Sequence, residues 1–324
     1  MRCFLGVDVG GTKTQALVAD ERGRAAGFGQ GGPGNHEEVG YAGLAHAMRQ
    51  AMDQALAQSG IGVEQIAGAG FGVAGDDWPC EREPTLQAIA TLGLNAPVEA
   101  VNDALIGLLA GSAEGWGVAV VSGTGCNCWG WDRTRQRIGQ VTGSGSAMGE
   151  GAGASELVAK AVQTVAHAWT QRGPPTQLTA ALVKHTGARN AGDLLEGLCT
   201  ARIWLDASAA PLVFKVAAAG DAVARNVIEW AGQELGELAN AVIRQLEFQV
   251  LEFDVVLVGS MYDGGPALIE PMRATVQALA PKARLVRLTV PPVVGAVLLA
   301  MQQAGADASR ARETLVRSVL SGGA

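Results

Sequence analysis

The sequence predicts an α/β protein in which one order of strands and helices occurs twice, giving mixed sheets flanked by helices. Two observations predict it. Two apolar strands, 4–9 and 118–121, each enter a glycine-threonine turn and leave it as another strand. Each hairpin is followed by segments in which helical and strand patterns alternate. The duplication predicts a first domain over 1–115 and a second over 116–305, with a C-terminal helix at 306–324 able to join the first.

The elements of the first half follow the hydrophobic pattern. A third strand completes the first hairpin, and a helix over 35–59 places Leu44, Met48, Met52 and Leu56 at four-residue spacing before Gly60 ends it. The remaining elements expected here are a strand at 65–73, a helix at 83–92, a strand at 97–101 and a helix at 104–111.

The second half begins again with a hairpin, whose return strand is 126–131. Strands are expected at 254–258 and 284–288. Helices are expected at 152–171, 176–186, 191–203, 208–219, 222–249, 266–280, 293–304 and 307–320.

Composition limits the classes of function. The 324 residues are 48% hydrophobic and 17% charged, which is typical of a compact globular protein with little disorder. A net charge of −7 without a Lys/Arg run argues against a nucleic-acid or anionic-membrane partner. The N-terminus does not have the pattern of a secretory signal, and no stretch reaches the ~18 apolar residues of a membrane helix. We therefore expect a cytoplasmic protein whose five cysteines are reduced.

The two glycine-threonine turns are the strongest functional signal. The first glycine loop is Gly10-Gly11-Thr12-Lys13, and the second glycine loop is Gly123-Thr124-Gly125. Glycines allow the backbone to approach an anion and direct N–H groups at it, and threonine adds a hydroxyl donor. A strand and not a helix follows each loop, so neither a P-loop nor a Rossmann turn fits. The pair predicts two phosphate-binding loops that face one cleft, although each loop alone could be a plain hairpin turn.

Asp8 is an acidic residue in an otherwise apolar strand, two positions before the first glycine loop. A buried carboxylate is costly unless something pairs with it. A Mg²⁺ ion that bridges nucleotide phosphates and is held through water would be such a partner, so Asp8 is a candidate metal residue.

These motifs together resemble the sugar kinase, heat-shock 70 and actin superfamily. The resemblance rests on their order along residues 1–300, and the later motifs narrow it to the branch of N-acetylglucosamine kinase and the activator ATPases of 2-hydroxyacyl-CoA dehydratases. The resemblance implies two ribonuclease-H-like domains, ATP bound in the cleft between them, and Mg²⁺. The superfamily resemblance rests on Asp8 with the first glycine loop and on Ser122-Gly123-Thr124-Gly125-Cys126-Asn127. The motifs that narrow it are Asn35-His36, Gly75-Asp76-Asp77, Asn102-Asp103-Ala104 and Val258-Gly259-Ser260.

Asp103 is the candidate catalytic base. In the kinases that the chain resembles, the matching aspartate accepts the proton of the attacking sugar hydroxyl. Asp103 follows a strand and begins a helix, and the positive end of the helix dipole is expected to hold its carboxylate ionised. The alternative is that Asp103 only caps the helix.

The resemblance also implies nucleotide and sugar contacts. Besides the two glycine loops, the expected nucleotide contacts are Gly259, Ser260 and Gly295. The expected sugar contacts are Asn35, His36, Asp76, Asp77, Asn102, Asp103, Cys126, Asn127, Gly145 and Glu150. Asn35 could instead cap a helix, and Cys126 with Cys128 could simply pack in the core.

One stretch departs from the pattern of this branch. The chain reads Gly143-Ser144-Gly145 where a Gly-Trp-Gly segment is usual, and Glu150 stands where the sugar-binding aspartate is expected. The expected activity is ATP-dependent phosphorylation of an amino sugar, N-acetylglucosamine at its 6-hydroxyl, by a homodimer. The alternatives are a kinase for glucosamine or another hexose, a sugar-independent activator ATPase that drives a partner, and a sugar-responsive regulator.

Overall fold

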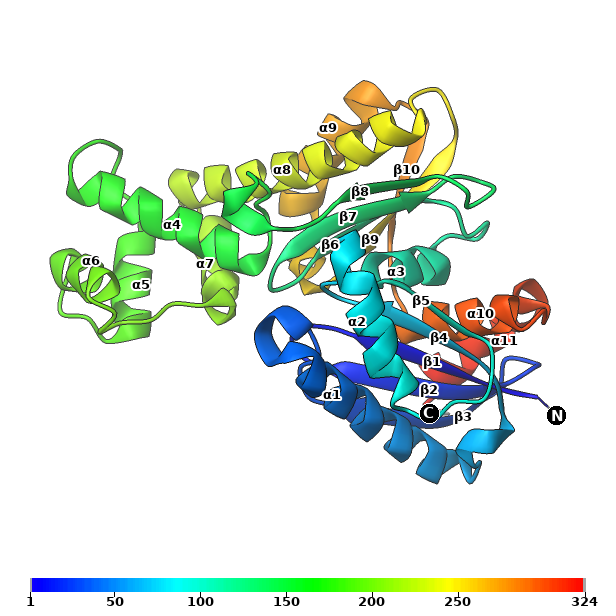
Figure 1. Ribbon diagram of the computed structural model, residues 1–324. Coiled ribbons are helices and arrows are strands. Elements are labelled where there is room, and N and C mark those ends of the chain that lie inside the picture. Colours follow the sequence, from blue (N-terminus) through cyan, green and yellow to red (C-terminus); the bar gives the residue numbers. More distant parts are fainter. Residues whose placement is uncertain (1, 323–324) are drawn as a thin grey trace.

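The computed structural model describes residues 2–322, with only the backbone of Ser146, and contains two five-stranded mixed sheets (Figure 1). The first sheet has the order β3-β2-β1-β4-β5. In it β1 pairs antiparallel with β2 on one side and parallel with β4 on the other. Strand β3 pairs antiparallel with β2, and β5 pairs parallel with β4. Its strands are β1 (Cys3–Val9), β2 (Thr14–Asp20), β3 (Ala25–Gly31), β4 (Ile66–Val73) and β5 (Val98–Asn102).

The second sheet repeats this arrangement. Its order is β10-β9-β6-β7-β8, with β6 antiparallel to β7 and parallel to β9. Its strands are β6 (Gly117–Ser122), β7 (Cys126–Trp131), β8 (Ile138–Val141), β9 (Phe253–Val258) and β10 (Ala283–Arg287). The predicted duplicated α/β fold is confirmed. In each half a third strand, β3 or β8, pairs with the return strand of the hairpin.

Helices cover the outer faces of both sheets. On the first sheet α1 (His36–Ser59) and α2 (Pro79–Ala90) enclose one hydrophobic core, and α1 is interrupted at Gly40, where φ is +68°. On the second sheet the long α8 lies across β6, β7 and β8. The helices of this half are α4 (Ala154–Trp169), α5 (Leu178–Thr186), α6 (Ala191–Cys199), α7 (Ala210–Ala218), α8 (Ala222–Leu246) and α9 (Pro266–Leu279).

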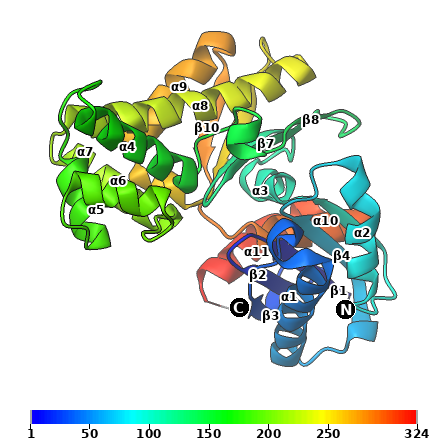
Figure 2. The same cartoon turned by 60° about the vertical axis from the view of Figure 1, so that its left-hand side comes forward.

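Helices α4 to α7 form a lobe at one side of the second half, away from the first sheet (Figures 1 and 2). None of the helices within residues 2–322 is both long and apolar enough to cross a membrane.

The inner layer between the sheets consists of α3 (Asp103–Gly111), α10 (Val293–Gln303) and α11 (Ala308–Leu320). Trp129 and Trp131 of β7 face this layer, whereas Cys126 and Cys128 of the same strand face the core under α8. The alternation follows from the two-residue period of a strand.

Helix α10 lies on the first sheet, and this differs from the predicted boundary at residue 305. It packs against β1, β4 and α3, and glycines of the sheet allow it to come very close. A Cβ atom on Gly6 would lie 2.5 Å from the backbone nitrogen of Val297, and one on Gly68 would lie 2.7 Å from the carbonyl oxygen of Ala300. The chain therefore returns to the first half near residue 293, one helix earlier than expected. The sequence could not show this, because α10 is apolar on all sides and its pattern does not identify the sheet that it covers.

Candidate active site

Both glycine loops line one cavity of about 460 Å³ between the two halves. The first glycine loop joins β1 to β2, and the second joins β6 to β7, so the repeated topology brings the same hairpin turn to the cavity from each half. The first half also contributes Asp8, Asn35, Glu37, Glu38, Ala74, Gly75, Asp77 and Asp103. The second half contributes Val121, Cys126, Asn127, Thr142, Gly143, Ser155, Val258 and Gly259, and Pro292 lies just before α10.

The first glycine loop is a tight turn with exposed tips. The amide of Gly10 donates to the carbonyl of Lys13 at 3.0 Å, and the amide of Gly34 donates to the carbonyl of Gly10 at 3.0 Å. Thr12 and Lys13 are exposed, so the hydroxyl and the ammonium group are free to meet an anion in the cavity.

The second glycine loop is held by α4. The amides of Ala154 and Ser155 donate to the carbonyls of Gly123 and Thr124 at 2.8 and 3.0 Å. Gly153 lies so close to the loop that a Cβ there would be 2.5 Å from the backbone of Gly125. These contacts leave the carbonyls of the loop directed at the helix start, and they fix its position relative to the sheet.

Asp103 is the first residue of α3 and lies in the cavity. Asn127 of β7 donates from Nδ2 to Asp103 Oδ1 at 3.1 Å, so this contact joins the two halves. Burial raises the pKa of Asp103, and the hydrogen bonds from Asn127 and from the backbone at 103–104 oppose that rise. Burial of Asp103 thus acts against the helix N-terminus, which is expected from the sequence to favour the ionised carboxylate.

The cap of α3 is the preceding residue. Asn102 accepts from the amide of Ala104 at 2.9 Å and donates from Nδ2 to Asp77 Oδ1 at 2.8 Å. Asn102 therefore lines a neighbouring pocket and not this cavity. Asp77 has its pKa raised to about 8, first by burial and then by the nearby Asp103 carboxylate.

Asp8, the candidate metal residue, lies in the lining of the cavity. Burial and the neighbouring Asp103 raise its pKa to about 7, and Lys13 opposes this only in part. A carboxylate with this environment gains most from a cation. No cluster of three or more His, Cys, Asp or Glu side chains suited to a metal occurs in the described part of the chain. Mg²⁺ usually takes one or two carboxylates together with phosphates and water.

Asn35 and Cys126 line the cavity but have structural roles as well. Asn35 caps α1, accepting from the amide of Glu37 at 3.1 Å and donating to its carboxylate at 3.0 Å. The thiol of Cys126 is buried, and burial raises its pKa to about 12, so it is a neutral wall group.

Besides Asn102, four predicted sugar contacts do not line the cavity. His36 stacks on Tyr41, with ring centroids 4.5 Å apart, and its Nε2 lies 3.6 Å from Glu81. Asp76 turns away and pairs with Arg82 at 3.1 Å. Gly145 lies in a short turn at Gly145–Ala147, and Glu150 accepts from the amide of Ser144 at 2.7 Å. Glu150 therefore holds its own loop in this structure, since its longer side chain reaches back to the backbone.

The three predicted nucleotide contacts at strand and helix ends separate in space. Gly259 lines the cavity with a φ of +108°, and a Cβ there would collide with the carbonyl of Ser122, so only glycine suits this position. Ser260 is exposed outside the lining. Gly295 is buried where α10 meets the backbone of Ile106 in α3, which makes it a helix-packing glycine.

Several lining residues were not identified from the sequence. Glu37 and Glu38 belong to the first turn of α1, and Ser155 begins α4. Acidic residues in a first turn usually only complement the helix dipole, so they gave no functional signal.

Two known proteins match this sequence along nearly its whole length. An N-acetylmuramic acid/N-acetylglucosamine kinase of Clostridium acetobutylicum is 23% identical over 305 residues, covering 94% of this chain and 99% of its own. An N-acetyl-D-glucosamine kinase of Dictyostelium discoideum is 25% identical over 312 residues, covering 92% and 97%.

Solved structures show the same fold. A protein of Chromobacterium violaceum, provisionally assigned as an N-acetylglucosamine kinase, superimposes with a TM-score of 0.67 at 23% identity, covering 92% of this chain and 99% of its own. A ROK family glucokinase of Streptomyces griseus, solved with glucose and AMPPNP, gives 0.57 at 22% identity, covering 93% and 99%.

The BadF/BadG/BcrA/BcrD ATPase family matches residues 5–300, which include both glycine loops, Asp8 and Asp103. This match confirms ATP as the expected nucleotide. The chain belongs to the BadF/BadG/BcrA/BcrD ATPase family.

Proposed function

We propose that this protein is an ATP-dependent kinase for an amino sugar, and that N-acetylglucosamine is phosphorylated at its 6-hydroxyl with Asp103 as the base. The observation that carries the proposal is that two glycine loops from different halves and the Asp103 carboxylate line one cavity. The curated relatives support the same activity, since both are named as kinases of N-acetylglucosamine.

The transfer step needs one base. The sugar hydroxyl oxygen attacks the γ-phosphorus of ATP, the new P–O bond forms, and the bond from that phosphorus to the ADP oxygen breaks. The hydroxyl proton passes to the Asp103 carboxylate. A base placed in this way contributes roughly 10²–10⁴-fold, and its raised pKa brings it closer to the working pH.

Two groups beside Asp103 would orient the sugar. Asn127 holds Asp103 through Nδ2, and its Oδ1 is buried without a partner among the described residues. A buried amide oxygen is costly to leave unpaired, and a sugar hydroxyl would supply the missing donor. Asn127 and Asp103 come from different halves and are already joined at 3.1 Å, so closure of the cleft around a bound sugar would act by excluding water.

The phosphates would lie between the glycine loops. Amides of the first glycine loop, the Thr12 hydroxyl and the Lys13 ammonium approach from one side, and the Thr124 hydroxyl approaches from the other. Asp8 would hold Mg²⁺ through water, and the bound ion neutralises charge on the phosphates.

Asp103→Asn and Asp103→Ala test the base. Each variant is expected to lower kcat for N-acetylglucosamine by roughly 10²–10⁴-fold with little change in ATP affinity. Asp53→Asn, an exposed acid on the far part of α1, is the matched control and keeps wild-type turnover. Undiminished turnover in Asp103→Ala defeats the assignment of the base.

A sugar panel tests the acceptor. ADP release is measured with N-acetylglucosamine, N-acetylmuramic acid, glucosamine, glucose and no sugar. We expect the highest kcat/KM with N-acetylglucosamine. Fast turnover with glucosamine or glucose would favour the broader hexose kinase. ADP release at the same rate with and without sugar would favour the activator ATPase. Protein-bound iron and sulfide would then be assayed under anaerobic conditions.

Assembly and location remain predictions. A homodimer is expected, and size-exclusion chromatography with light scattering measures it. A cytoplasmic location is expected, and cell fractionation tests it.

A further inference from the structure

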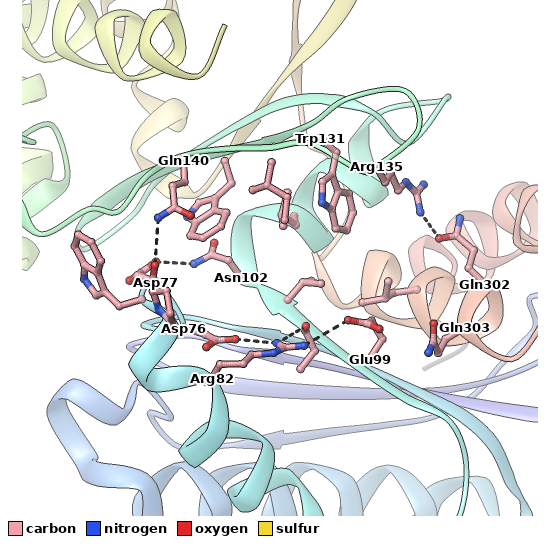
Figure 3. A pocket seen from close by; sticks show the side chains of 18 residues that line it. Asp76, Asp77, Arg82, Glu99, Asn102, Trp131, Arg135, Gln140, Gln302 and Gln303 are labelled. Atoms are coloured by element: carbon pink, nitrogen blue, oxygen red, sulfur yellow. Dashed lines mark hydrogen bonds and ion pairs between the residues drawn. The ribbon is translucent and has the colours of Figure 1, made fainter. Parts of the chain in front are cut away.

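A second pocket of about 700 Å³ lies beside the candidate active site and is also walled by both halves (Figure 3). The first half supplies the segment before α2, residues of α2 and β5, and the C-terminal end of α10. The second half supplies β7, β8 and the turn between them. This pocket is within the ordinary range of small-molecule sites, roughly 300–1,000 Å³.

A thin wall separates this pocket from the cavity that contains Asp103. Asp77 lines both spaces, and Asn102 lines only the second. Asn102 donates to the Asp77 carboxylate at 2.8 Å, and Gln140 Nε2 donates to the Asp77 carbonyl at 3.3 Å (Figure 3). A ligand in the second pocket would therefore contact Asn102 and Asp77 from the side opposite the catalytic cavity, and not the reacting groups.

The charges around this pocket compensate one another. Arg82 pairs with Asp76 at 3.1 Å and with Glu99 at 3.5 Å. Arg135 donates from Nε to the carbonyl of Gly115 at 3.1 Å. Its Nη1 donates to Gln302 at 2.5 Å (Figure 3). Burial and the nearby Asp103 raise the pKa of Asp77 to about 8, which favours the neutral form of that carboxyl. Two guanidinium groups thus face two carboxylates, which favours a neutral ligand over a phosphate or a cation.

The walls combine flat aromatic faces with amide side chains. Trp78 is 43% exposed, and Trp129 and Trp131 form the buried side of the pocket. The indole Nε1 of Trp129, a residue only 6% exposed, has no hydrogen-bond partner among the described residues. Trp129 therefore contributes the surface of its ring to the pocket, while its Nε1 lies out of reach of solvent.

These features match the chemistry of a carbohydrate. A sugar ring has an apolar C–H face that packs on an indole, and a rim of hydroxyls that both donate and accept. The side-chain amides of Gln140 and Gln303 offer the complementary donor and acceptor pairs.

We propose that this second pocket is a non-catalytic binding site for a neutral saccharide of one or two rings, separate from the cavity that holds Asp103.

Isothermal titration calorimetry with a β-1,4-linked N-acetylglucosamine dimer and with cellobiose tests this proposal. The protein is first saturated with N-acetylglucosamine and a non-hydrolysable ATP analogue, which occupies the catalytic cavity. Saturable binding of at least one disaccharide is expected. Trp78→Ala and Gln303→Ala should each raise the Kd, by roughly 2–10-fold for the loss of one hydrogen bond and more for the indole face.

Trp204→Ala is the matched control, since Trp204 is an 80% exposed indole outside the pocket, and it should leave the Kd unchanged. Both pocket variants should keep sugar-dependent ADP release within about twofold of wild type, because neither side chain lines the catalytic cavity. Gln303→Ala decides the matter if Trp78→Ala fails to fold.

Absence of disaccharide binding to the saturated protein overturns the proposal. So does binding that Trp78→Ala and Gln303→Ala both leave unchanged, or binding that excess N-acetylglucosamine displaces, since the disaccharide would then occupy the catalytic cavity. The kinase proposal is judged separately, by ADP release with monosaccharides.

Discussion

The two halves present opposite chemistry to the candidate active site although they repeat one strand order. Among the described residues that line this cavity, all of the charged ones come from the first half, and they are five acids and one lysine. The wall from the second half is uncharged and consists of glycines, small hydroxyl residues, Asn127, Cys126 and valines. The two halves therefore share one strand order, while the carboxylates and the lysine lie on one side and backbone and hydroxyl donors lie on the other.

The two glycine loops differ in the same sense. The first glycine loop closes on itself through Gly10 and Lys13 and projects exposed side chains. The second glycine loop is fixed to the start of α4 by two backbone hydrogen bonds and by the close approach of Gly153. We expect the first to act through charge and the second through a fixed position.

The largest effect is expected at the charged wall. Asp8→Asn removes the carboxylate proposed to hold Mg²⁺, and kcat should fall by roughly 10²–10³-fold, as for loss of a preorganised charge-stabilising group. The Mg²⁺ concentration for half-maximal rate should rise as well. Steady-state kinetics over a Mg²⁺ series measure both, and an unchanged Mg²⁺ dependence would remove Asp8 from the metal site.

A smaller effect is expected where the second glycine loop meets α4. Gly153→Ala forces a Cβ against the backbone of Gly125, so it should lower the free energy of unfolding by about 1–3 kcal/mol and raise the KM for ATP. Gly11→Ala is the matched variant in the first glycine loop. A Cβ there would lie 3.9 Å from the Glu38 carboxylate, its nearest neighbour among the described residues, so stability should change by less than about 0.5 kcal/mol. Urea unfolding compares them, and equal losses would contradict the difference between the loops.

Salt should distinguish the two walls. Thr124→Ala and Lys13→Ala each remove one proposed phosphate contact, and each should weaken ATP binding by roughly tenfold. The loss in Lys13→Ala should shrink as salt is raised to ~0.5 M, because salt screens an exposed ammonium, while the loss in Thr124→Ala should persist. Calorimetric titration with the ATP analogue at two salt concentrations gives both values. The same salt response in both variants would argue against an uncharged second wall.

The smallest effect is expected in the pH dependence of stability. Asp77 has a folded pKa of about 8 against an ordinary value of 3.8, so the folded protein binds more protons than the unfolded chain between these values. Its contribution to stability is present below pH 3.8 and is lost as pH rises toward 8. Asp77→Asn should remove this loss and stabilise the ligand-free protein at pH 8 by on the order of 1 kcal/mol, with no gain at pH 4. Thermal unfolding at both pH values measures it, and a destabilised variant at pH 8 would contradict the raised pKa.

The sequence was sufficient for the parts of the fold that depend on local pattern. Alternating strands, the turns between them and the helix that begins at Asp103 all follow from short-range preferences, and the order of motifs identified the superfamily. Packing between distant elements was not accessible in this way. The position of α10 depends on close contact with Gly6 and Gly68 in another part of the chain.

The same limit applies to individual site residues. Asp103 and Asn127 were predicted from their motifs, and the structure places them 3.1 Å apart across the cleft. Glu150 was expected beside the sugar, but its side chain bonds to the amide of Ser144, and Asp76 pairs with Arg82. Motif position gives the neighbourhood of a side chain, while its rotamer depends on partners that only the folded chain supplies.

Hydrogen exchange followed by mass spectrometry, with and without Mg²⁺ and a non-hydrolysable ATP analogue, tests most directly whether one nucleotide is held by both halves. Exchange should slow in peptides that contain residues 10–13 and in peptides that contain residues 123–125, and the peptide over 200–206 in the distant helical lobe should not change. Protection confined to one of the two loops, or to neither, would contradict the shared phosphate site.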